Sequence, residues 1–174
     1  MEPTIVETQQ MLLVGFSFFG DPFNLSGGWT EENEIGRTWK RFMSFLEEHP
    51  QRLKQVTTDE IAYEVHIYHK ETPQTGEFEV FVGLEVDELE DVPLELCAKV
   101  LPPATYAVFT LRGEQIVSDW PMMIFGEWLP QAGYEGEHSH SIQRYDERFK
   151  GVDCIAESIL EVYIPVKNSG PGSA

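Results

Sequence analysis

Residues 159–166 of the chain read Ile-Leu-Glu-Val-Tyr-Ile-Pro-Val, which is the alternating pattern of a half-buried β-strand. Successive side chains of a strand point to opposite faces, so Leu160 and Val162 share one face, and Glu161 and Tyr163 share the other. A carboxylate beside a phenol suits a solvated strand edge, and it equally suits the wall of a cavity for an apolar, positively charged ligand. The pattern predicts the strand and leaves both interpretations of Glu161 open.

Outward from this strand, two helices are expected at 31–48 and 118–129. The first places Ile35, Trp39 and Phe42 at helical spacing and ends before Pro50. The second has Pro121, which a helix tolerates only in its first turn. Apolar runs and alternation predict strands at 11–19, 61–69, 77–86, 94–101, 104–111, 140–145 and 158–166.

The order strand–helix–strand–strand occurs twice, which predicts an α+β fold of two βαββ repeats. We expect one domain over residues 1–167, with repeat one at about 11–86, repeat two at about 94–167 and a flexible tail at 168–174. Identity between the halves is low, so the duplication rests on element order. Both helices should pack on one side of the sheet. A ligand cleft is expected on the pseudo-twofold axis, because ligand sites favour seams between units.

Composition narrows the class of protein. The chain has 174 residues, 30 acidic against 12 basic side chains and a net charge of −18, which disfavours direct binding to nucleic-acid phosphates. Two cysteines are too few for a disulfide framework, and the segment Met1-Glu2-Pro3-Thr4 lacks the pattern of a secretion signal. No apolar run reaches the length of a membrane span. We therefore expect a cytoplasmic protein that binds neither membrane nor cofactor.

Specific catalytic or metal motifs are not evident. His66 and His69, and likewise His138 and His140, invite a zinc interpretation, but no third ligand follows by spacing. We therefore predict that the five histidines lie on the surface and bind no metal. No nucleophile elbow or phosphate-binding loop is present, so the sequence assigns no catalytic residue.

Short motifs along the chain carry a resemblance to a known family. They are Val14-Gly15, Phe19-Gly20, Asn33-Glu34-Ile35 with Trp39 and Phe42, Gly76-Glu77-Phe78-Glu79, Tyr106-Ala107-Val108-Phe109-Thr110, Gly126-Glu127-Trp128-Leu129-Pro130, Gly133-Tyr134-Glu135, Tyr145-Asp146-Glu147-Arg148-Phe149 and Tyr163-Ile164-Pro165-Val166. In this order, over about residues 11–167, the chain resembles the bacterial GyrI-like, or AraC-type effector-binding, domain.

This resemblance implies two βαββ repeats around a central pocket. Related domains are the ligand-sensing halves of AraC- and MerR-type transcription activators, where stacked aromatics and a buried glutamate bind bulky lipophilic cations. The chain looks like a stand-alone member without its own DNA-binding domain, which implies drug binding and multidrug recognition, with transcription regulation through a separate regulator. Other stand-alone members hydrolyse alkylating, cyclopropane-bearing compounds or protect DNA gyrase.

One departure from the family pattern bears on these alternatives. Similar members carry Glu two residues before the Tyr of the Tyr-Asp-Glu-Arg-Phe segment, where this chain has Gln143. Glutamine cannot carry charge or act as a general acid or base, which disfavours the hydrolase and leaves Glu161 as the better partner for a cation. The acidity of the chain would also suit a gyrase-binding protein that mimics nucleic acid.

The expected ligand contacts lie in one cavity lined by both helix tryptophans, with Gln143 at its rim. The same aromatic residues could equally form a core. If the chain is a hydrolase, Glu161 and a pocket tyrosine would act. The residues predicted to contact the ligand are Glu161, Tyr163, Trp39, Trp128, Gln143, Tyr63, Phe16 and Tyr106.

Overall fold

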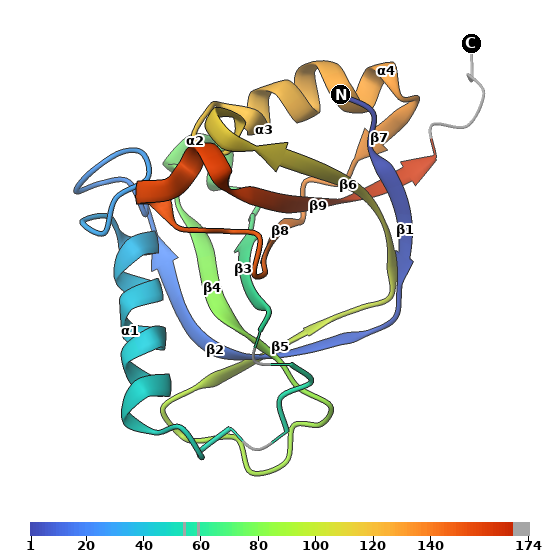
Figure 1. Ribbon diagram of the computed structural model, residues 1–174. Helices are drawn as coiled ribbons and strands as arrows, with labels where there is room; N and C mark the ends of the chain where they lie inside the picture. Colours follow the sequence, from blue (N-terminus) through green and yellow to red (C-terminus); the bar gives the residue numbers. More distant parts are fainter. Residues whose placement is uncertain (54, 59, 169–174) are drawn as a thin grey trace.

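The computed structural model describes residues 1–53, 55–58 and 60–168, and it is a mixed α/β fold dominated by an antiparallel sheet (Figure 1). Most of the predicted tail, residues 169–174, lies outside the described residues. The strands are β1 (Thr4–Thr8), β2 (Met11–Gly20), β3 (Ala62–Ile67), β4 (Phe78–Glu85), β5 (Cys97–Leu101), β6 (Ala104–Arg112), β7 (Tyr134–Gly136), β8 (His140–Tyr145) and β9 (Ile159–Asn168). The helices are α1 (Glu34–Glu48), α2 (Thr72–Thr75), α3 (Trp120–Met123) and α4 (Leu129–Gln131).

The predicted helices begin later than the sequence pattern suggested, because a side chain caps each of them. Asn33 accepts a hydrogen bond from the Gly36 amide at 2.9 Å, which starts α1 at Glu34 instead of residue 31. Asp119 caps α3 in the same way, and Pro121 lies in its first turn as expected. The expected helix at 118–129 continues from α3 through a π-helical turn at 124–128 into α4.

Sequence patterns missed two short strands and one short α-helix. They are β1, β7 and α2, which have five, three and four residues. Segments this short contain too few residues for a periodicity to be recognised. Two of them are strands that lengthen the sheet, since β1 pairs with β6 and β7 pairs with β9.

The sheet joins the two halves of the chain through β3 and β8. Its order is β1-β6-β9-β8-β3-β4-β2-β5, with β7 added on β9. In the first half, β2 pairs with β4 and β4 pairs with β3. In the second half, β6 pairs with β9 and β9 pairs with β8. The strands β3 and β8 then pair with each other. This order agrees with the expected joining of two units, while the pseudo-twofold symmetry itself stays a prediction.

A second connection between the halves makes the sheet curve round on itself. The ladder of β1 with β6 ends at Thr8 opposite Ala104, and the ladder of β2 with β5 resumes at Met11 opposite Leu101. From Thr8 to Met11 and from Ala104 back to Leu101 the chain covers three positions on each side. The two ladders therefore keep the same register across the break. Pro102-Pro103 interrupts the pairing because proline lacks an amide hydrogen. Figure 1 shows β1 and β6 at the right of the ring-shaped sheet and β2 and β5 along its lower part.

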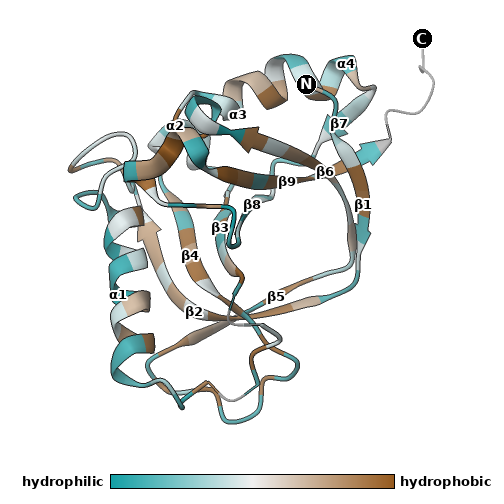
Figure 2. Cartoon of the chain, in the orientation of Figure 1, coloured by the Kyte–Doolittle hydropathy of each residue, from teal (hydrophilic) through white to brown (hydrophobic). Residues whose placement is uncertain are grey.

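The two faces of this sheet have different partners. The outer face carries the helices: Phe42 of α1 packs with Val80 and Val82 of β4, and Trp128 packs with Val162 of β9. This places α1 and the α3–α4 segment on one side of the sheet, as expected. The inner face holds its own apolar cluster of Leu13, Tyr63, Val65, Phe81, Leu101, Tyr106, Val108 and Ile142. Figure 2 shows β9 as a mostly apolar strand and α1 with polar and apolar residues alternating.

Candidate functional site

The eight predicted contact residues divide between the two faces of the sheet. Trp39, Trp128, Gln143 and Phe16 lie on the outer face, whereas Glu161, Tyr163, Tyr63 and Tyr106 lie on the inner face. The physical reason is the pairing of β8 with β9, which sets Gln143 opposite Val162 and Arg144 opposite Glu161. The structure therefore separates residues that we expected to line one cavity.

A buried carboxylate that the sequence analysis missed lies on the outer face. Glu64 of β3 is 3% exposed and accepts hydrogen bonds from Trp39 Nε1 at 2.5 Å and Gln143 Nε2 at 3.0 Å, and His66 Nε2 lies 2.7 Å from it. The hydroxyl of Tyr145 lies 3.4 Å from Oε2, the oxygen that Trp39 also contacts. Indole and amide N–H groups only donate, and the His66 ring nitrogen donates in one of its tautomers, so an ionised Glu64 can accept from each of these groups.

The charge of Glu64 has no strong cation beside it. Among residues 1–53, 55–58 and 60–168, no lysine or arginine forms an ion pair with Glu64; its ion-pair partner there is His66, which is charged only when protonated. Burying a carboxylate costs several kcal/mol unless a positive charge compensates it. The buried carboxylate therefore carries an electrostatic cost that a nearby positive charge would lower.

Aromatic rings surround this carboxylate. Trp39 and Tyr145 meet edge to face with ring centroids 4.9 Å apart, and Phe149 meets Tyr145 at the same distance. On the other side, Phe78 lies 5.1 Å from His66. Burial, and secondarily Glu64, raise the pKa of Tyr145 well above its ordinary value, so its hydroxyl keeps its proton.

Gln143, which stands where similar members carry a glutamate, lies beside Glu64. Gln143 lies directly opposite Glu64 in the ladder of β3 and β8, and it is 2% exposed instead of lying at a rim. Its amide donates to the carboxylate, while Tyr145 donates to its carbonyl oxygen at 3.2 Å. The negative charge absent from position 143 is therefore present one strand away, on the same face.

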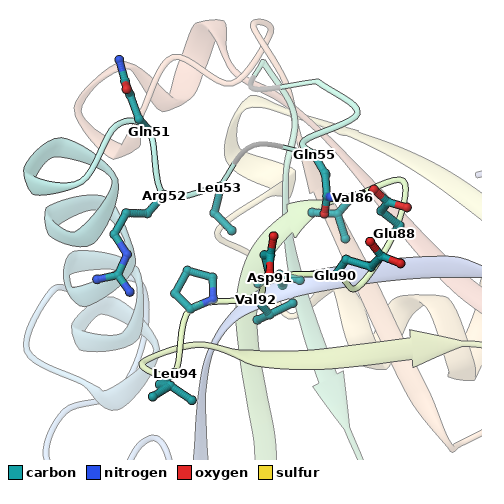
Figure 3. A pocket seen from close by; sticks show the side chains of 12 residues that line it. Gln51, Arg52, Leu53, Gln55, Val86, Glu88, Glu90, Asp91, Val92 and Leu94 are labelled. Carbon is teal, nitrogen blue, oxygen red and sulfur yellow. Dashed lines mark hydrogen bonds between the residues drawn. The ribbon is translucent and has the colours of Figure 1, made fainter.

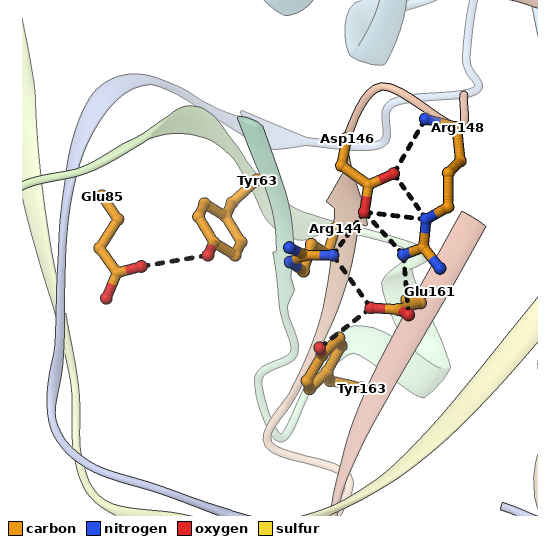
Figure 4. Close-up of polar contacts among 7 residues, drawn as sticks. All are labelled: Tyr63, Glu85, Arg144, Asp146, Arg148, Glu161 and Tyr163. Carbon is orange, nitrogen blue, oxygen red and sulfur yellow. Dashed lines mark hydrogen bonds and ion pairs between the residues drawn. The ribbon is translucent and has the colours of Figure 1, made fainter. Parts of the chain in front are cut away.

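Glu161 lies in a different environment on the inner face (Figure 4). Its carboxylate accepts hydrogen bonds from Arg144 at 3.1 Å, Arg148 at 2.8 Å and the Tyr163 hydroxyl at 3.1 Å. Asp146 shares both arginines. Two acids and two bases leave this group of side chains neutral, so Glu161 is not the unpaired charge that we expected.

The shared face of Glu161 and Tyr163 is confirmed by their direct hydrogen bond. Burial, and secondarily Glu161, raise the pKa of Tyr163 to about 12. The other predicted inner-face tyrosines also have polar partners: Tyr63 donates to Glu85 at 3.1 Å, and the Tyr106 hydroxyl lies 2.9 Å from His140 Nε2. These contacts satisfy the hydroxyls within the protein.

Asp146 provides a pH-dependent prediction. Hydrogen bonds from Arg148 lower the pKa of this carboxyl to about 2, so the interaction stabilises the folded state above pH ~4 and is lost as the pH falls toward ~2. Carboxyl-carbon NMR titration should show this low pKa, and Arg148→Ala should raise it. Arg37→Ala, which removes an exposed ion pair on α1, should leave it unchanged. A pKa that stays near 2 without Arg148 would contradict the assignment.

Two surface hollows lie away from Glu64. One, of about 440 Å³, is bounded by loops after α1 and β4 (Figure 3) and is lined by Val14, Gln51, Arg52, Leu53, Gln55, Val86, Glu88, Glu90, Asp91, Val92, Pro93 and Leu94. It contains none of the predicted contacts and no aromatic ring. The other is an open groove beside α1 that includes Phe16, whose ring lies 4.6 Å under the Arg41 guanidinium. Arg37 and Lys40 also line the groove, together with Glu48 and Glu95, so its charge is mixed.

The histidines do not assemble a metal site. Within the described part of the chain, no group of three or more His, Cys, Asp or Glu side chains could hold a metal ion. The prediction that all five are surface histidines is wrong for His66, which is 8% exposed and bonded to Glu64. Its position on β3 puts it on the same face as Glu64, because side chains two positions apart in a strand share a face.

Comparison with known proteins places this chain in a family. A family model described as integron-associated effector binding protein, Cass2, matches residues 4–166. The chain belongs to this family. The resemblance to GyrI-like effector-binding domains is thereby confirmed. A search of curated proteins finds no match to this chain. No helix in residues 1–53, 55–58 and 60–168 is long and apolar enough to cross a membrane.

Solved structures similar to this Cass2 member share its fold over nearly the whole chain. SAV2435 bound to tetraphenylphosphonium is 16% identical, with a TM-score of 0.66 and coverage of 96% of this chain and 94% of that one. The integron cassette protein VCH_CASS2 of Vibrio cholerae is 17% identical, with a TM-score of 0.61 and coverage of 95% and 96%. The EcmrR C-terminal domain is 13% identical, with a TM-score of 0.61 and coverage of 96% and 98%.

Glu64 had a sequence signal that could have found it. The segment 61–69 alternates, so Glu64, His66 and Tyr68 share a face in the same way as Glu161 and Tyr163. Both strands thus offered a carboxylate beside an aromatic residue. Only the pairing of β3 with β8 shows that Glu64 lies under α1, beside Trp39 and Gln143.

Proposed function

We propose that the protein binds aromatic, lipophilic cations at Glu64 and acts as a cytoplasmic sensing or sequestering protein. The observation that carries this proposal is the buried carboxylate of Glu64, which is surrounded by rings and paired with no lysine or arginine in the described chain. Membership in an effector-binding family supports it, and so does the tetraphenylphosphonium bound by SAV2435.

The location of Glu64 agrees with a site between two repeats. Glu64 and Gln143 come from the middle strands β3 and β8, which join the two halves of the sheet. We propose that the pseudo-twofold axis passes between these strands and that the ligand lies against them on the outer face. Of the predicted contacts, Trp39 and Gln143 then belong to the site directly.

A ligand must open this site to enter it. Glu64 is nearly inaccessible, whereas the rings of Trp39, Tyr68 and Phe149 are partly exposed. Displacing the rings of Tyr68 and Phe149 would bring a ligand beside the carboxylate and offer it aromatic faces, while Trp39 keeps its hydrogen bond to Glu64. A cation over an aromatic face gains about 0.5–2 kcal/mol, and more when both partners are desolvated. Different ring positions would accommodate cations of different shape, which is what multidrug recognition requires.

The hydrolase and gyrase-binding alternatives have less support. A general base must accept a proton from water, but the oxygens of Glu64 already accept hydrogen bonds from Trp39, His66 and Gln143. Gln143 cannot take over that role. The acidic segment 71–98 could contact a protein such as gyrase, but acidic surfaces commonly serve solubility.

Titration with tetraphenylphosphonium tests the proposal. The cation should bind measurably in calorimetry, quench tryptophan fluorescence through Trp39 and raise the melting temperature. Saturation at one hundred times the Kd should stabilise the folded state by about 2.7 kcal/mol. An uncharged compound of similar size, triphenylmethane, should bind much more weakly. Equal binding of both compounds would contradict charge recognition, and absence of binding by either would contradict the function.

A further inference from the structure

The carboxylate of Glu64 combines an available charge with occupied acceptor positions. His66 and Gln143 donate to Oε1, while Trp39 and the hydroxyl of Tyr145 lie at Oε2. A carboxylate offers about four lone-pair positions. With Glu64 ionised, the N–H groups of Trp39, His66 and Gln143 occupy three of them, and the Tyr145 hydroxyl, whose single proton is shared with Gln143, covers the fourth. The carbonyl oxygen of Gln143 is also occupied, because Tyr145 shares its proton with that oxygen.

We propose that this site selects cations without N–H or O–H donors, such as phosphonium and quaternary ammonium compounds, over protonated amines of the same shape. The inference rests on the proposed function and names the ligand class of that site. A donor-free cation can use the negative charge at a distance and leave all four hydrogen bonds in place. A protonated amine must either displace one of the four donors or bury its own N–H without an acceptor.

Burying the N–H of the amine without an acceptor carries a cost that no contact at Glu64 offsets. A buried donor without a partner, particularly a charged one, loses the hydrogen bonds that it made with water. The alternative, displacement of Trp39 Nε1 from a 2.5 Å hydrogen bond, leaves the buried indole N–H unpaired instead. Either way, the amine should bind about tenfold or more weakly than its N-methylated counterpart.

The test uses a matched pair of ligands. N,N-Dimethyl-1-(9-anthryl)methanamine, protonated at pH 7, is compared with its N,N,N-trimethyl salt by calorimetry, with tetraphenylphosphonium as a reference cation. Because the extra methyl group adds some apolar contact in every variant, the decisive quantity is the change in the affinity ratio between variants. Wild-type protein should prefer the quaternary salt at least about tenfold.

Trp39→Phe keeps a ring but removes the donor to Oε2, which opens an acceptor position for the amine. The ratio should then fall to about threefold or less. The matched control is Trp29→Phe, since Trp29 is also partly buried but packs against Phe149 and does not bond Glu64. Its ratio should remain that of the wild type. If Trp39→Phe does not fold, Tyr145→Phe removes the second donor at Oε2 and should lower the ratio in the same direction.

The outcomes separate this inference from the proposed function. Equal binding of amine and quaternary salt by the wild type would overturn the donor-free preference while leaving cation binding intact. An affinity ratio that stays at the wild-type value in folded Trp39→Phe or Tyr145→Phe would show that the preference does not arise at Glu64. Failure of all three cations to bind would overturn both the preference and the proposed function.

Discussion

Glu64→Gln should weaken binding of tetraphenylphosphonium about ten- to hundredfold while changing the affinity for triphenylmethane little. The substitution preserves the shape of the side chain but removes the buried charge, which no lysine or arginine of the described chain neutralises. Losing an interaction with a charged group typically costs about 1.5–3 kcal/mol, or one to two decades in affinity. Calorimetric titration of both compounds measures the difference, and thermal unfolding of the unliganded variant verifies its fold.

Glu161→Gln is the matched control for this experiment. Glu161 is paired with Arg144 and Arg148 on the inner face, so its removal should change cation affinity less than about threefold. If Glu161→Gln abolishes selective cation binding and Glu64→Gln does not, the ligand contacts the inner face, as the sequence alone suggested. Tyr163, Tyr63 and Tyr106 would then be its aromatic contacts. The pair of variants therefore decides between the two faces.

Phe42→Ala should destabilise the protein by about 3–5 kcal/mol, the range for removing a large buried aromatic side chain. Phe42 is fully buried where α1 packs on Val80, Val82 and Leu84 of β4. The deletion removes apolar contacts and leaves a cavity that the sheet cannot fill. Because α1 also carries Trp39, the variant should lose ligand affinity together with stability. Urea denaturation monitored by circular dichroism measures the free energy of unfolding.

Met43→Ala serves as the comparison on the same helix. Met43 is 46% exposed, so its truncation should cost less than about 0.5 kcal/mol. A similar loss for Met43→Ala and Phe42→Ala would mean that α1 does not dock through Phe42. A loss below about 1 kcal/mol for Phe42→Ala would contradict the packing of the helix on β4.

Local patterns were sufficient for much of the fold. Alternation at 61–69, 77–86 and 159–166 predicted β3, β4 and β9, and helical spacing of Trp39 and Phe42 predicted α1. These patterns can be recognised within a single segment, because the repeat of 2.0 residues in a strand and of 3.6 residues in a helix follows from the geometry of the backbone. Motifs in order along the chain were also enough to indicate the family, which the match over residues 4–166 confirms.

The site could be predicted only in part. Trp39 and Gln143 were both predicted ligand contacts, and the structure brings them together at Glu64, while their contact with a ligand stays a prediction. Glu161 was chosen as the charged partner because it shares a strand face with Tyr163 and because Gln143 replaces the family glutamate. The pattern of its own strand did not reveal Arg148, which reaches it from the segment after β8. The partners of a charge depend on tertiary contacts, and these decide whether the charge is neutralised.

The sequence by itself determined the kind of each long element, the face shared by Glu161 and Tyr163, and membership in an effector-binding family. Only the tertiary structure decided which carboxylate lies among neutral donors and which lies between arginines. Glu64 and Gln143 are 79 positions apart and meet because β3 pairs with β8 in one register. Alternation sets which side chains share a face of one strand, but hydrogen bonding between distant strands sets which faces and charges come together.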